Sequence, residues 1–466
     1  MPLSPFLRRP AVPLASVALL TALALPGSTA AVAAPTSPAL PSTPTRPAPA
    51  ATQQPAATSL QKVRVQVPSG LGAAPFDRAR TLSVPKGWTV SVWARTDKPR
   101  LEALTPDGRL LVSRPAHGDV LVLTPRKGGQ PTSATLVRGL RQPHGLVFDG
   151  STLYVAESNR VDSYRYSAGK VGARSTVLDG LPDGESDDLN GAYAHALKSV
   201  AVGHNHALYV SVGSTGNLSA TDRHEDPQRA TILRVAKGAH TSTVFARGVR
   251  NGTGLAFAPD GALWTAVNNR DNVAYPFHKD YDGKGGDDYK KVVPAYVNDH
   301  PIEPFAHIVR RRDLGWPYCN PTPDVHAGVR GTAFDYSSRP FDRDVQTNAN
   351  GRLLDCSKLP RLEQGLPAHS APLGLSFTRT SLAGVGSGAL VGVHGSWNRQ
   401  PPRAPEVSFF PYSKGSMGDR RTILSGFQGS DGGRWGRPVA AVQGADGAVY
   451  VSDDRAGAVY RLAPPA

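Results

Sequence analysis

The chain has 466 residues, which is long enough to bury the core of a large domain. Its 48 glycines and 42 prolines favour many short strands joined by turns over long helices. The formal net charge is +15, but the basic residues are scattered, and the absence of helix-turn-helix, RNP and zinc-finger patterns argues against nucleic-acid binding. The charge indicates attraction to anionic material, or arginines that line a site for an anionic ligand.

The first 62 residues are predicted to lie outside the folded domain. Arg8 and Arg9 precede the apolar run 11–25, and small residues follow it, as in a secretory signal peptide. A membrane anchor is the alternative, but this run is shorter than the ~20 residues that span a bilayer, so residues 1–33 are predicted to be cleaved. Residues 34–62, rich in Ala and Pro, are predicted to form a disordered linker. The protein is expected to be secreted, periplasmic or associated with the cell wall, with no integral membrane segment after cleavage.

Residues 63–466 are predicted to form one β-propeller domain. A pattern of two alternating apolar strands, joined by a turn that usually contains Gly with Asp or Asn, recurs along this region. The repeats begin near Leu101, His144, Leu197, Gly254, Pro372 and Pro438. Their spacing, mostly ~40–60 residues, is typical of propeller blades, so the sequence predicts an all-β, six-bladed β-propeller, with a β-sandwich as the alternative. The strand-like segment Val90–Ala94 is predicted to close the ring against the last blade.

The gap between the fourth and fifth repeat units is longer than the others. It contains Cys319, Cys356 and the polar stretch 275–350, and it is interpreted as a long insertion on one face. In an exported chain the two cysteines are expected to form a disulfide, which would contribute about 3–4 kcal/mol on the entropic model.

A closed ring would bring the ends of its inner strands to one shared pocket. This placement selects candidate residues that are far apart in the sequence: His144, His195, Arg250, Asn269, His394 and Arg437.

Several motifs occur in order from about Leu140 to the C-terminus. They are RQPHGLVF, AHALKSV, EDPQRATILRV, GVRNGTGLAF, LGWPYC, HSAPLGLSF, HGSWNR and RWGRPVAAV. Together they resemble the soluble PQQ-dependent glucose/sorbosone dehydrogenase family, most closely its sorbosone dehydrogenase-like branch. The resemblance implies a six-bladed propeller that binds pyrroloquinoline quinone (PQQ) and calcium and oxidises a sugar or aldehyde.

The resemblance also implies roles for individual residues. His195 matches the catalytic general base, and backbone carbonyls of Asn269 and Arg270 fall where calcium is held. Matches to cofactor-binding positions are Gln142, Lys198, Arg250, Asn251, Trp397, Asn398, Arg399 and Arg437. Two departures stand out: Lys198 replaces a more common arginine, and Ser214 replaces an aspartate that orients the base in glucose-oxidising members.

The chemistry agrees with these assignments. PQQ carries three carboxylates, for which arginine offers paired N–H donors. A neutral imidazole suits removal of a hydroxyl proton while a hydride leaves the sugar carbon. The sequence therefore predicts an exported PQQ-dependent sugar or aldehyde dehydrogenase, whose substrate is an aldose or related sugar aldehyde and whose electron acceptor is unidentified.

Two other functions remain open. A metal-dependent lactonase-type propeller would use Glu157, Asn269 and Asp453 around a central ion. A non-enzymatic propeller would bind sugar or cell-wall material. The acidic tract His278–Asp288 lacks the EF-hand spacing and is interpreted as a solvated loop.

Overall fold

The computed structural model describes residues 59–184 and 193–465, which form an all-β fold. Regular helix in these residues is confined to one short α-helix, α1 (Pro294–Val297), and three short 3-10 helices. None of the described helices is long and apolar enough to cross a membrane. The predicted signal peptide lies outside the described residues, as does the linker up to residue 58. Strand β1 begins at Leu60, within the stretch that was assigned to the linker.

The strands form six sheets of four or more strands, together with a two-stranded ribbon of β19 (Cys319–Pro321) and β21 (Phe341–Arg343). Three sheets follow the chain directly: β4 (Glu102–Leu104), β5 (Leu110–Arg114), β6 (Asp119–Arg126) and β7 (Gly129–Arg138); β8 (Gly145–Asp149), β9 (Thr152–Ala156), β10 (Val161–Ser167) and β11 (Lys170–Leu178); β12 (Ser199–Val202), β13 (Leu208–Val212), β14 (Thr231–Val235) and β15 (Ser242–Arg247).

The other three sheets contain strands from distant parts of the chain. They are β16 (Gly254–Phe257), β17 (Leu263–Ala266), β18 (Glu303–Ile308), β22 (Leu362–Leu366) and β20 (Ser337–Arg339); β23 (Pro372–Phe377), β24 (Gly388–Val393), β25 (Glu406–Ser413), β27 (Arg421–Ser425), β2 (Thr81–Pro85) and β1 (Leu60–Arg64), with β26 (Ser416–Met417) beside β25; and β28 (Pro438–Gln443), β29 (Val449–Asp453), β30 (Ala458–Ala463) and β3 (Thr89–Arg95).

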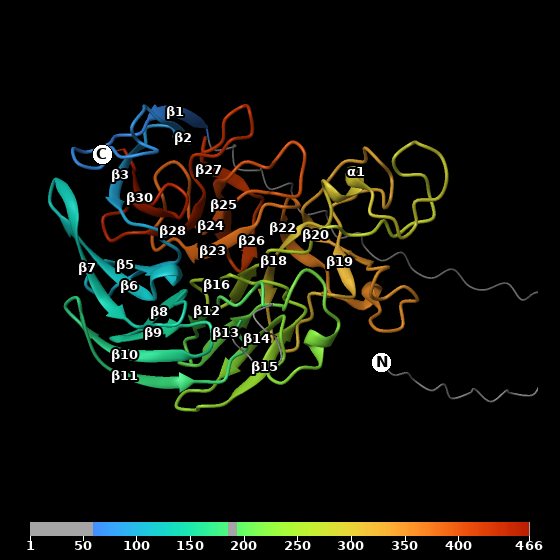
Figure 1. The fold of residues 1–466 in the computed structure, drawn as a ribbon, viewed down its shortest axis with the longest axis horizontal. Coiled ribbons are helices and arrows are strands. Elements are labelled where there is room, and N and C mark those ends of the chain that lie inside the picture. The colour runs from blue at the N-terminus through green and yellow to red at the C-terminus, as the bar shows by residue number, and fades with distance from the viewer. Residues whose placement is uncertain (1–58, 185–192, 466) are drawn as a thin grey trace, which may run out of the picture. The chain divides into compact units, whose positions relative to one another are not determined.

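The first strands of these sheets surround a common centre (Figure 1). Strand β4 contacts β8, β8 contacts β12, β12 contacts β16, β16 contacts β23, β23 contacts β28, and β28 returns to β4. Apolar side chains fill the space between neighbouring sheets, as where Val161 of one sheet joins the core cluster of Val200 and Val210 of the next. This closed cycle confirms the predicted β-propeller.

An N-terminal strand completes the last sheet. Strand β3 pairs antiparallel with β30, with Val90 opposite Leu462 and Ser91 opposite Arg461. Val90 and Val92 are buried, so β3 contributes to the core as well as to hydrogen bonding. The prediction that Val90–Ala94 closes the ring is confirmed.

Glycines allow the inner strands to approach closely. A Cβ added at Gly145 would lie 2.7 Å from the backbone nitrogen of Val200, and one at Gly374 would lie 2.6 Å from the Cβ of Ala440. Neighbouring first strands therefore touch where a larger residue would push them apart.

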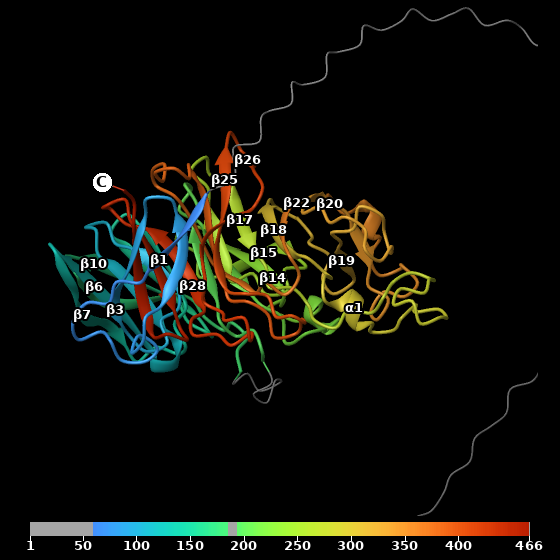
Figure 2. The ribbon, with the colours of Figure 1, turned by 90° about the horizontal axis from the view of Figure 1, so that it is seen from above.

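The long stretch after the fourth repeat does not form one insertion between complete units. Strands β18 and β22 belong to the sheet that β16 and β17 begin, so the additional residues lie within that sheet, in the connections 267–302 and 309–361. The hairpin pattern in the sequence marked only the first two strands of this sheet. The additional residues were therefore predicted to lie after the unit, whereas they lie between its own strands. In both views α1, β19 and β20 extend to one side of the ring (Figures 1 and 2).

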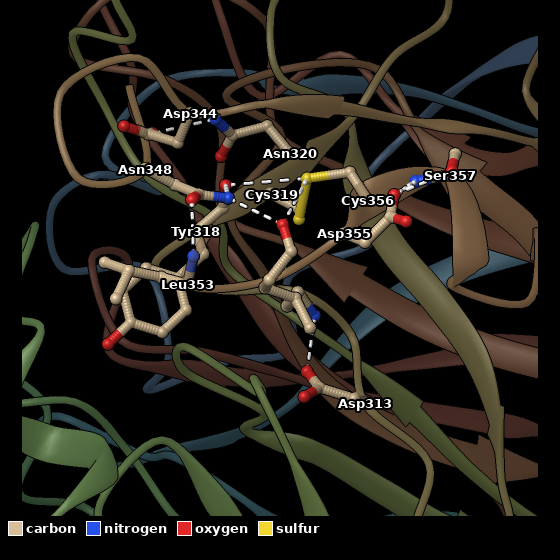
Figure 3. The surroundings of a disulfide bond; sticks show 12 residues. Asp313, Tyr318, Cys319, Asn320, Asp344, Asn348, Leu353, Asp355, Cys356 and Ser357 are labelled. Carbon is tan, nitrogen blue, oxygen red and sulfur yellow. Dashed lines mark hydrogen bonds between the residues drawn. A yellow bond between two sulfur atoms is a disulfide. The ribbon is translucent and has the colours of Figure 1, made fainter. Parts of the chain in front are cut away.

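A disulfide ties down this extension (Figure 3). Cys319 and Cys356 are bonded, with 5.7 Å between their Cα atoms and 37 residues of sequence separation. Asn348 supports the enclosed loop, since its Nδ2 donates to the Leu354 carbonyl at 2.7 Å and its Oδ1 accepts from the Leu353 amide at 3.1 Å. The predicted disulfide is confirmed.

Candidate functional site

Loops at one end of the ring enclose a pocket of about 300 Å³. Its walls come mainly from residues just before the first strands β4, β12, β16 and β28 and just after the second strands β17 and β24, which bring these positions to the same end of a propeller. The polar and aromatic lining includes Arg100, His195, Arg250, Asn251, Asp271, Glu303, His369, His394, Trp397 and Arg437. His195 and Arg437, 242 positions apart in the chain, thus face one cavity.

His195 is held by Ser214. Its Nδ1 lies 3.0 Å from the Ser214 carbonyl oxygen and 2.9 Å from the Ser214 Oγ, whose own proton goes to the Gly216 carbonyl at 2.7 Å. Because these oxygens can only accept here, Nδ1 carries the proton and Nε2 carries a lone pair. Burial, and then the charge of Arg250, lower the pKa of His195 to about 3. The ring is therefore a neutral base at ordinary pH.

Gly213 lies directly behind His195. A Cβ at this glycine would lie 2.6 Å from the His195 Cβ and 2.7 Å from its carbonyl oxygen. The Tyr193 hydroxyl donates to the Gly213 carbonyl at 2.6 Å, which fixes the strand end against the histidine loop. The position of the imidazole thus depends on a residue without a side chain.

Arg250 is engaged with backbone and amide oxygens. Its Nη1 donates to the carbonyls of Asn268 and Asn269 at 3.0 and 2.6 Å, and its Nη2 donates to the Asn217 Oδ1 at 3.1 Å. Burial lowers the pKa of Arg250 to about 10, so the group remains charged at neutral pH.

This contact bears on the predicted calcium site. The Asn269 carbonyl is one of the two oxygens expected to hold calcium, and the Arg250 guanidinium would repel a divalent ion placed there. The side chain of Arg270 is turned away into a buried ion pair with Asp344. The Asn269 carbonyl does not fit a calcium ion in this arrangement, whereas a calcium contact of the Arg270 carbonyl stays a prediction. Asp271 and Glu303 are the carboxyl groups on the pocket wall.

The opposite wall retains donors suited to an anion. Arg437 donates from Nε to the His394 carbonyl at 2.8 Å and from Nη2 to the Gly395 carbonyl at 3.2 Å, and its Nη1 has no partner among the described residues. Arg100 pairs with Asp454 through Nη1 at 2.8 Å, whereas its buried Nε has no partner in the described part of the chain. Unused guanidinium N–H groups fit the carboxylates of PQQ.

Three further groups in the pocket were not singled out from the sequence. His369 donates from Nε2 to the Val297 carbonyl at 2.6 Å and from Nδ1 to Asp271 at 3.1 Å, a pairing that needs both ring protons. Burial alone would lower the pKa of His369, but these hydrogen bonds outweigh burial and raise the pKa above its usual value. Burial raises the pKa of Glu303 to about 7. The motif HSAPLGLSF contains His369, but no local pattern connected it with Asp271 or Glu303.

Several predicted cofactor ligands do not line this pocket. Gln142 is exposed with a positive φ of 47°. The buried Lys198 donates to the carbonyls of Pro182 and Ala196 at 2.7 and 2.6 Å, and its Nζ lies 4.8 Å from the centre of the Tyr193 ring. Burial lowers the pKa of Lys198 to about 7, although the carbonyls and the aromatic face favour the charged ammonium.

The WNR segment divides between the pocket and its supporting loops. Trp397 lines the pocket with 73% of its surface exposed. Asn398 donates to the Asn272 side chain at 3.0 Å, and Arg399 contacts the Asn298 carbonyl at 3.2 Å and Asp299 at 3.2 Å. Asn398 and Arg399 therefore hold the loop in place and do not line the pocket.

Neither alternative ion-binding group forms a central metal site. Glu157 is bonded to Arg160 and to the Arg141 amide, whereas Asp453 accepts from the amides of Arg437, Arg455 and Ala456. His144 is buried, with Nδ1 3.2 Å from the Lys198 carbonyl, and it does not line the pocket.

The acidic tract His278–Asp288 does gather three carboxylates. They are Asp280, Asp282 and Asp288. Asp280 accepts from the amides of Gly283 and Gly285 at 2.8 Å each, and Asp288 accepts from the Tyr281 amide at 2.9 Å. These carboxylates shape their own loop, which lies outside the central pocket.

Comparison with known proteins gives a consistent result. A PQQ-dependent pyranose dehydrogenase of Coprinopsis cinerea is 24% identical over 421 residues, covering 81% of this chain and 54% of the relative, so the chain spans about half the length of that protein. The solved holo form of the pyranose dehydrogenase PQQ domain from that fungus has a TM-score of 0.65 at 21% identity, with 82% of this chain and 96% of that chain covered.

A second structural neighbour is the calcium structure of a Trichoderma reesei carbohydrate-active enzyme of family AA12. It has a TM-score of 0.64 at 21% identity and covers 82% of this chain and 96% of its own. At this level of identity the neighbours establish the shared fold.

The family model described as TrAA12-like matches residues 82–464, nearly the whole described region. The broader predicted resemblance to PQQ-dependent sugar dehydrogenases agrees with this match, whereas the narrower sorbosone dehydrogenase-like branch stays a prediction. From its fold, its pocket and this match, the chain belongs to the TrAA12-like family.

Proposed function

We propose that the protein is a PQQ-dependent dehydrogenase that oxidises a sugar at a carbon bearing a hydroxyl group. The observation that carries this proposal is the pairing, in one cavity, of a neutral histidine base with cationic donors. Nδ1 of His195 is fixed by Ser214, so Nε2 is the atom that accepts a proton, and Arg437 and Arg100 face the same space. The dehydrogenase relatives support the same assignment.

In this proposal the residues of the chain divide the work. PQQ supplies the two-electron redox chemistry by accepting the hydride. Its carboxylates would be bound by Arg437 and Arg100, and Asn251 would contribute an amide to the opposite wall. His195 Nε2 takes the hydroxyl proton from the sugar as the hydride leaves the same carbon, so that a C=O bond forms. The charge of Arg250 next to the imidazole lowers the pKa of His195, so the base is unprotonated before the sugar binds.

Trp397 would contact the sugar at the mouth of the pocket. An exposed indole offers a flat apolar face for the C–H groups of a sugar ring. The remaining wall, with Asp271, Glu303 and His369, carries the polar groups that orient sugar hydroxyls. We propose an aldose or related sugar aldehyde as the substrate class.

The same proposal includes the wider organisation of the chain. The six sheets of four or more strands are proposed as the six blades. Residues 1–33 are proposed as a signal peptide, 34–62 as a linker and 63–466 as the propeller domain. Strand β1 begins at Leu60, so the last residues of the proposed linker belong to a sheet. Export to the medium, the periplasm or the cell wall is supported by the disulfide.

Reconstitution tests the function directly. PQQ is added to the purified protein with and without Ca²⁺, its absorption is followed, and dye reduction is measured with a panel of aldoses. We expect PQQ binding and dye reduction that depends on both PQQ and sugar. The Ca²⁺ arm measures whether a cation adds to binding, for which Asp271 and Glu303 are the available donors.

The alternatives predict different outcomes. Acid release from lactones without PQQ would indicate a lactonase and contradict the proposal. Sugar binding with no PQQ absorption and no turnover would indicate a non-enzymatic binding protein. Because Glu157 and Asp453 already accept hydrogen bonds from Arg160 and from the Arg437 amide, we expect no lactonase activity.

A further inference from the structure

A second, broader groove adjoins the pocket beside the last sheet. It has a volume of about 890 Å³, and His394 and Arg437 line both the groove and the pocket, so the two spaces adjoin at these two side chains. Six basic side chains line it: Arg78, Arg80, Lys98, Arg434, Arg437 and Arg455. The function proposed above leaves five of these six without a role.

The acidic residues of the groove do not neutralise this charge. Asp454 is bound by Arg100 and His394, each at 2.8 Å. Asp431 accepts from the Gly433 amide of its own turn at 2.9 Å. Asp77 lies 4.0 Å from Arg78, at the limit of an ion pair, and both side chains are exposed.

The central arginines bond to neutral oxygens instead. Arg455 donates to the Arg434 carbonyl at 2.6 Å, Arg434 to the Gln428 side chain at 2.8 Å, and Arg437 to the His394 carbonyl at 2.8 Å. Within the described residues, none of these three forms an ion pair. Three adjacent guanidinium groups without a direct ion pair produce a positive potential that an anion would relieve.

The surroundings of these arginines lower the pKa values of two of them. Burial and then the neighbouring Arg434 lower the pKa of Arg437 to about 10, and burial and then Arg455 lower that of Arg434. Burial and, to a smaller extent, repulsion between these arginines therefore disfavour their charged forms, and bound anionic groups would compensate for both effects.

The shape of the groove favours a saccharide over a flat macromolecular surface. It is large enough for several sugar units, it adjoins the cavity where the reactive sugar must enter, and it contains the indole of Trp435 beneath the Arg80 guanidinium, with 5.1 Å between the guanidinium carbon and the ring centre. Trp397 lines the adjoining pocket. An elongated ligand whose end lies beside His195 could therefore extend over His394 and Arg437 towards the cations and the indole of the groove.

We propose that the groove binds the anionic part of an extended substrate: an acidic saccharide whose terminal sugar reacts in the pocket while its carboxylate or sulfate groups contact Arg78, Lys98 and Arg455. This proposal rests on the proposed function for the reacting end, but the groove can be tested without turnover.

The test compares acidic and neutral saccharides on the protein without added PQQ. Calorimetry measures binding of a trigalacturonate, a sulfated trisaccharide and an uncharged trisaccharide. The probe variant is Arg78→Gln with Lys98→Gln, since both residues are exposed and their loss should leave the fold intact. The matched control is Lys237→Gln with Arg310→Gln, two exposed cations outside the groove.

We expect at least one acidic trisaccharide to bind about tenfold or more tightly than the neutral one, and the probe variant to lose about tenfold in affinity while the control variant is unchanged. The affinity should also fall between 50 and 300 mM salt, by roughly the screening expected for exposed charges. The carboxylate and sulfate arms identify the acidic group.

Equal binding of acidic and neutral saccharides, or equal effects of probe and control variants, would overturn the proposal. Binding of polyglutamate but of no acidic saccharide would overturn it too and assign the groove to an acidic protein. Saccharide binding by the groove without PQQ-dependent turnover would uphold this inference while removing the proposed function.

Discussion

Two histidines face the pocket from opposite walls, and their partners differ. His195 is anchored through Nδ1 by the neutral Ser214, and its Nε2 has no protein partner among the described residues. His394 uses Nε2 to bind the Asp454 carboxylate at 2.8 Å, which lies 2.8 Å from Arg100. Burial lowers the pKa of both rings, to about 3 and about 4.

The comparison shows that burial alone does not make a histidine a base. Both rings are neutral, but Nε2 carries the lone pair in His195, whereas in His394 the same atom carries the proton and donates it to Asp454. His394 spends its equivalent atom on a network that positions two arginines. We therefore expect His195 to accept a proton from the substrate, and His394 to position the arginines that bind anionic groups.

The largest expected effect is the loss of the base. His195→Gln should lower kcat/KM by about 10³-fold, within the range for a general base, while PQQ binding persists. Steady-state dye reduction and PQQ absorption measure the two properties.

His394→Gln is the matched comparison on the other wall. The Gln amide can still donate to Asp454, so kcat/KM should fall less than about tenfold. Equal losses in the two variants would remove the distinction between the walls.

The next effect concerns the backing of His195. Gly213→Ala places a Cβ 2.6 Å from the His195 Cβ, and displacement of the ring should reduce kcat about 10²-fold. Gly216→Ala is the control, because its Cβ would meet nothing within 4 Å. A normal rate in Gly213→Ala, with the variant folded by circular dichroism, would show that the position of the ring tolerates a shift.

The pH profile tests the neutral state of the base. A histidine with its ordinary pKa near 6.5 would lose activity below neutrality, whereas the lowered pKa of His195, about 3, keeps it unprotonated to much lower pH. The acid limb of kcat/KM that His195 contributes should therefore appear only below about pH 4, provided that far-UV circular dichroism shows a folded protein. Glu303, whose pKa burial raises to about 7, can contribute a separate change near neutrality, so a limb near pH 6.5 that is absent from His195→Gln would mean that the ring is solvated or paired with a carboxylate during turnover.

The smallest effect is expected from the anchor. Ser214→Ala removes Oγ but leaves the Ser214 carbonyl 3.0 Å from Nδ1, so the tautomer is retained and kcat should fall about two- to fivefold. A loss as large as that of His195→Gln would assign the orientation of the base to the hydroxyl alone.

The sequence allowed the propeller to be predicted because each blade begins with a hairpin of regular alternation. The outer strands of the fourth sheet were missed, since β18, β22 and β20 are separated by connections of up to dozens of residues. Pairing across such distances depends on tertiary packing, which a local pattern does not contain.

The site was predictable to a similar extent. His195, Arg250, Asn251, Trp397 and Arg437 were identified and share the pocket. Lys198 was assigned from its position in the motif, but its Nζ satisfies two carbonyls instead. Glu303 and Asp271 were missed because Glu303 begins β18 and Asp271 lies in the long connection after β17, and only the pairing of these two strands brings the residues to one wall.

The pairing of β3 with β30 also constrains biosynthesis. The ring cannot close until the last strand, which ends at Ala463, has been synthesised. Until then β3 and β29 expose free edges, which can pair with other chains. A chain that ends just before Ala458 would contain every residue of the pocket. It would still lack the pairing of β30 with β3 that closes the ring.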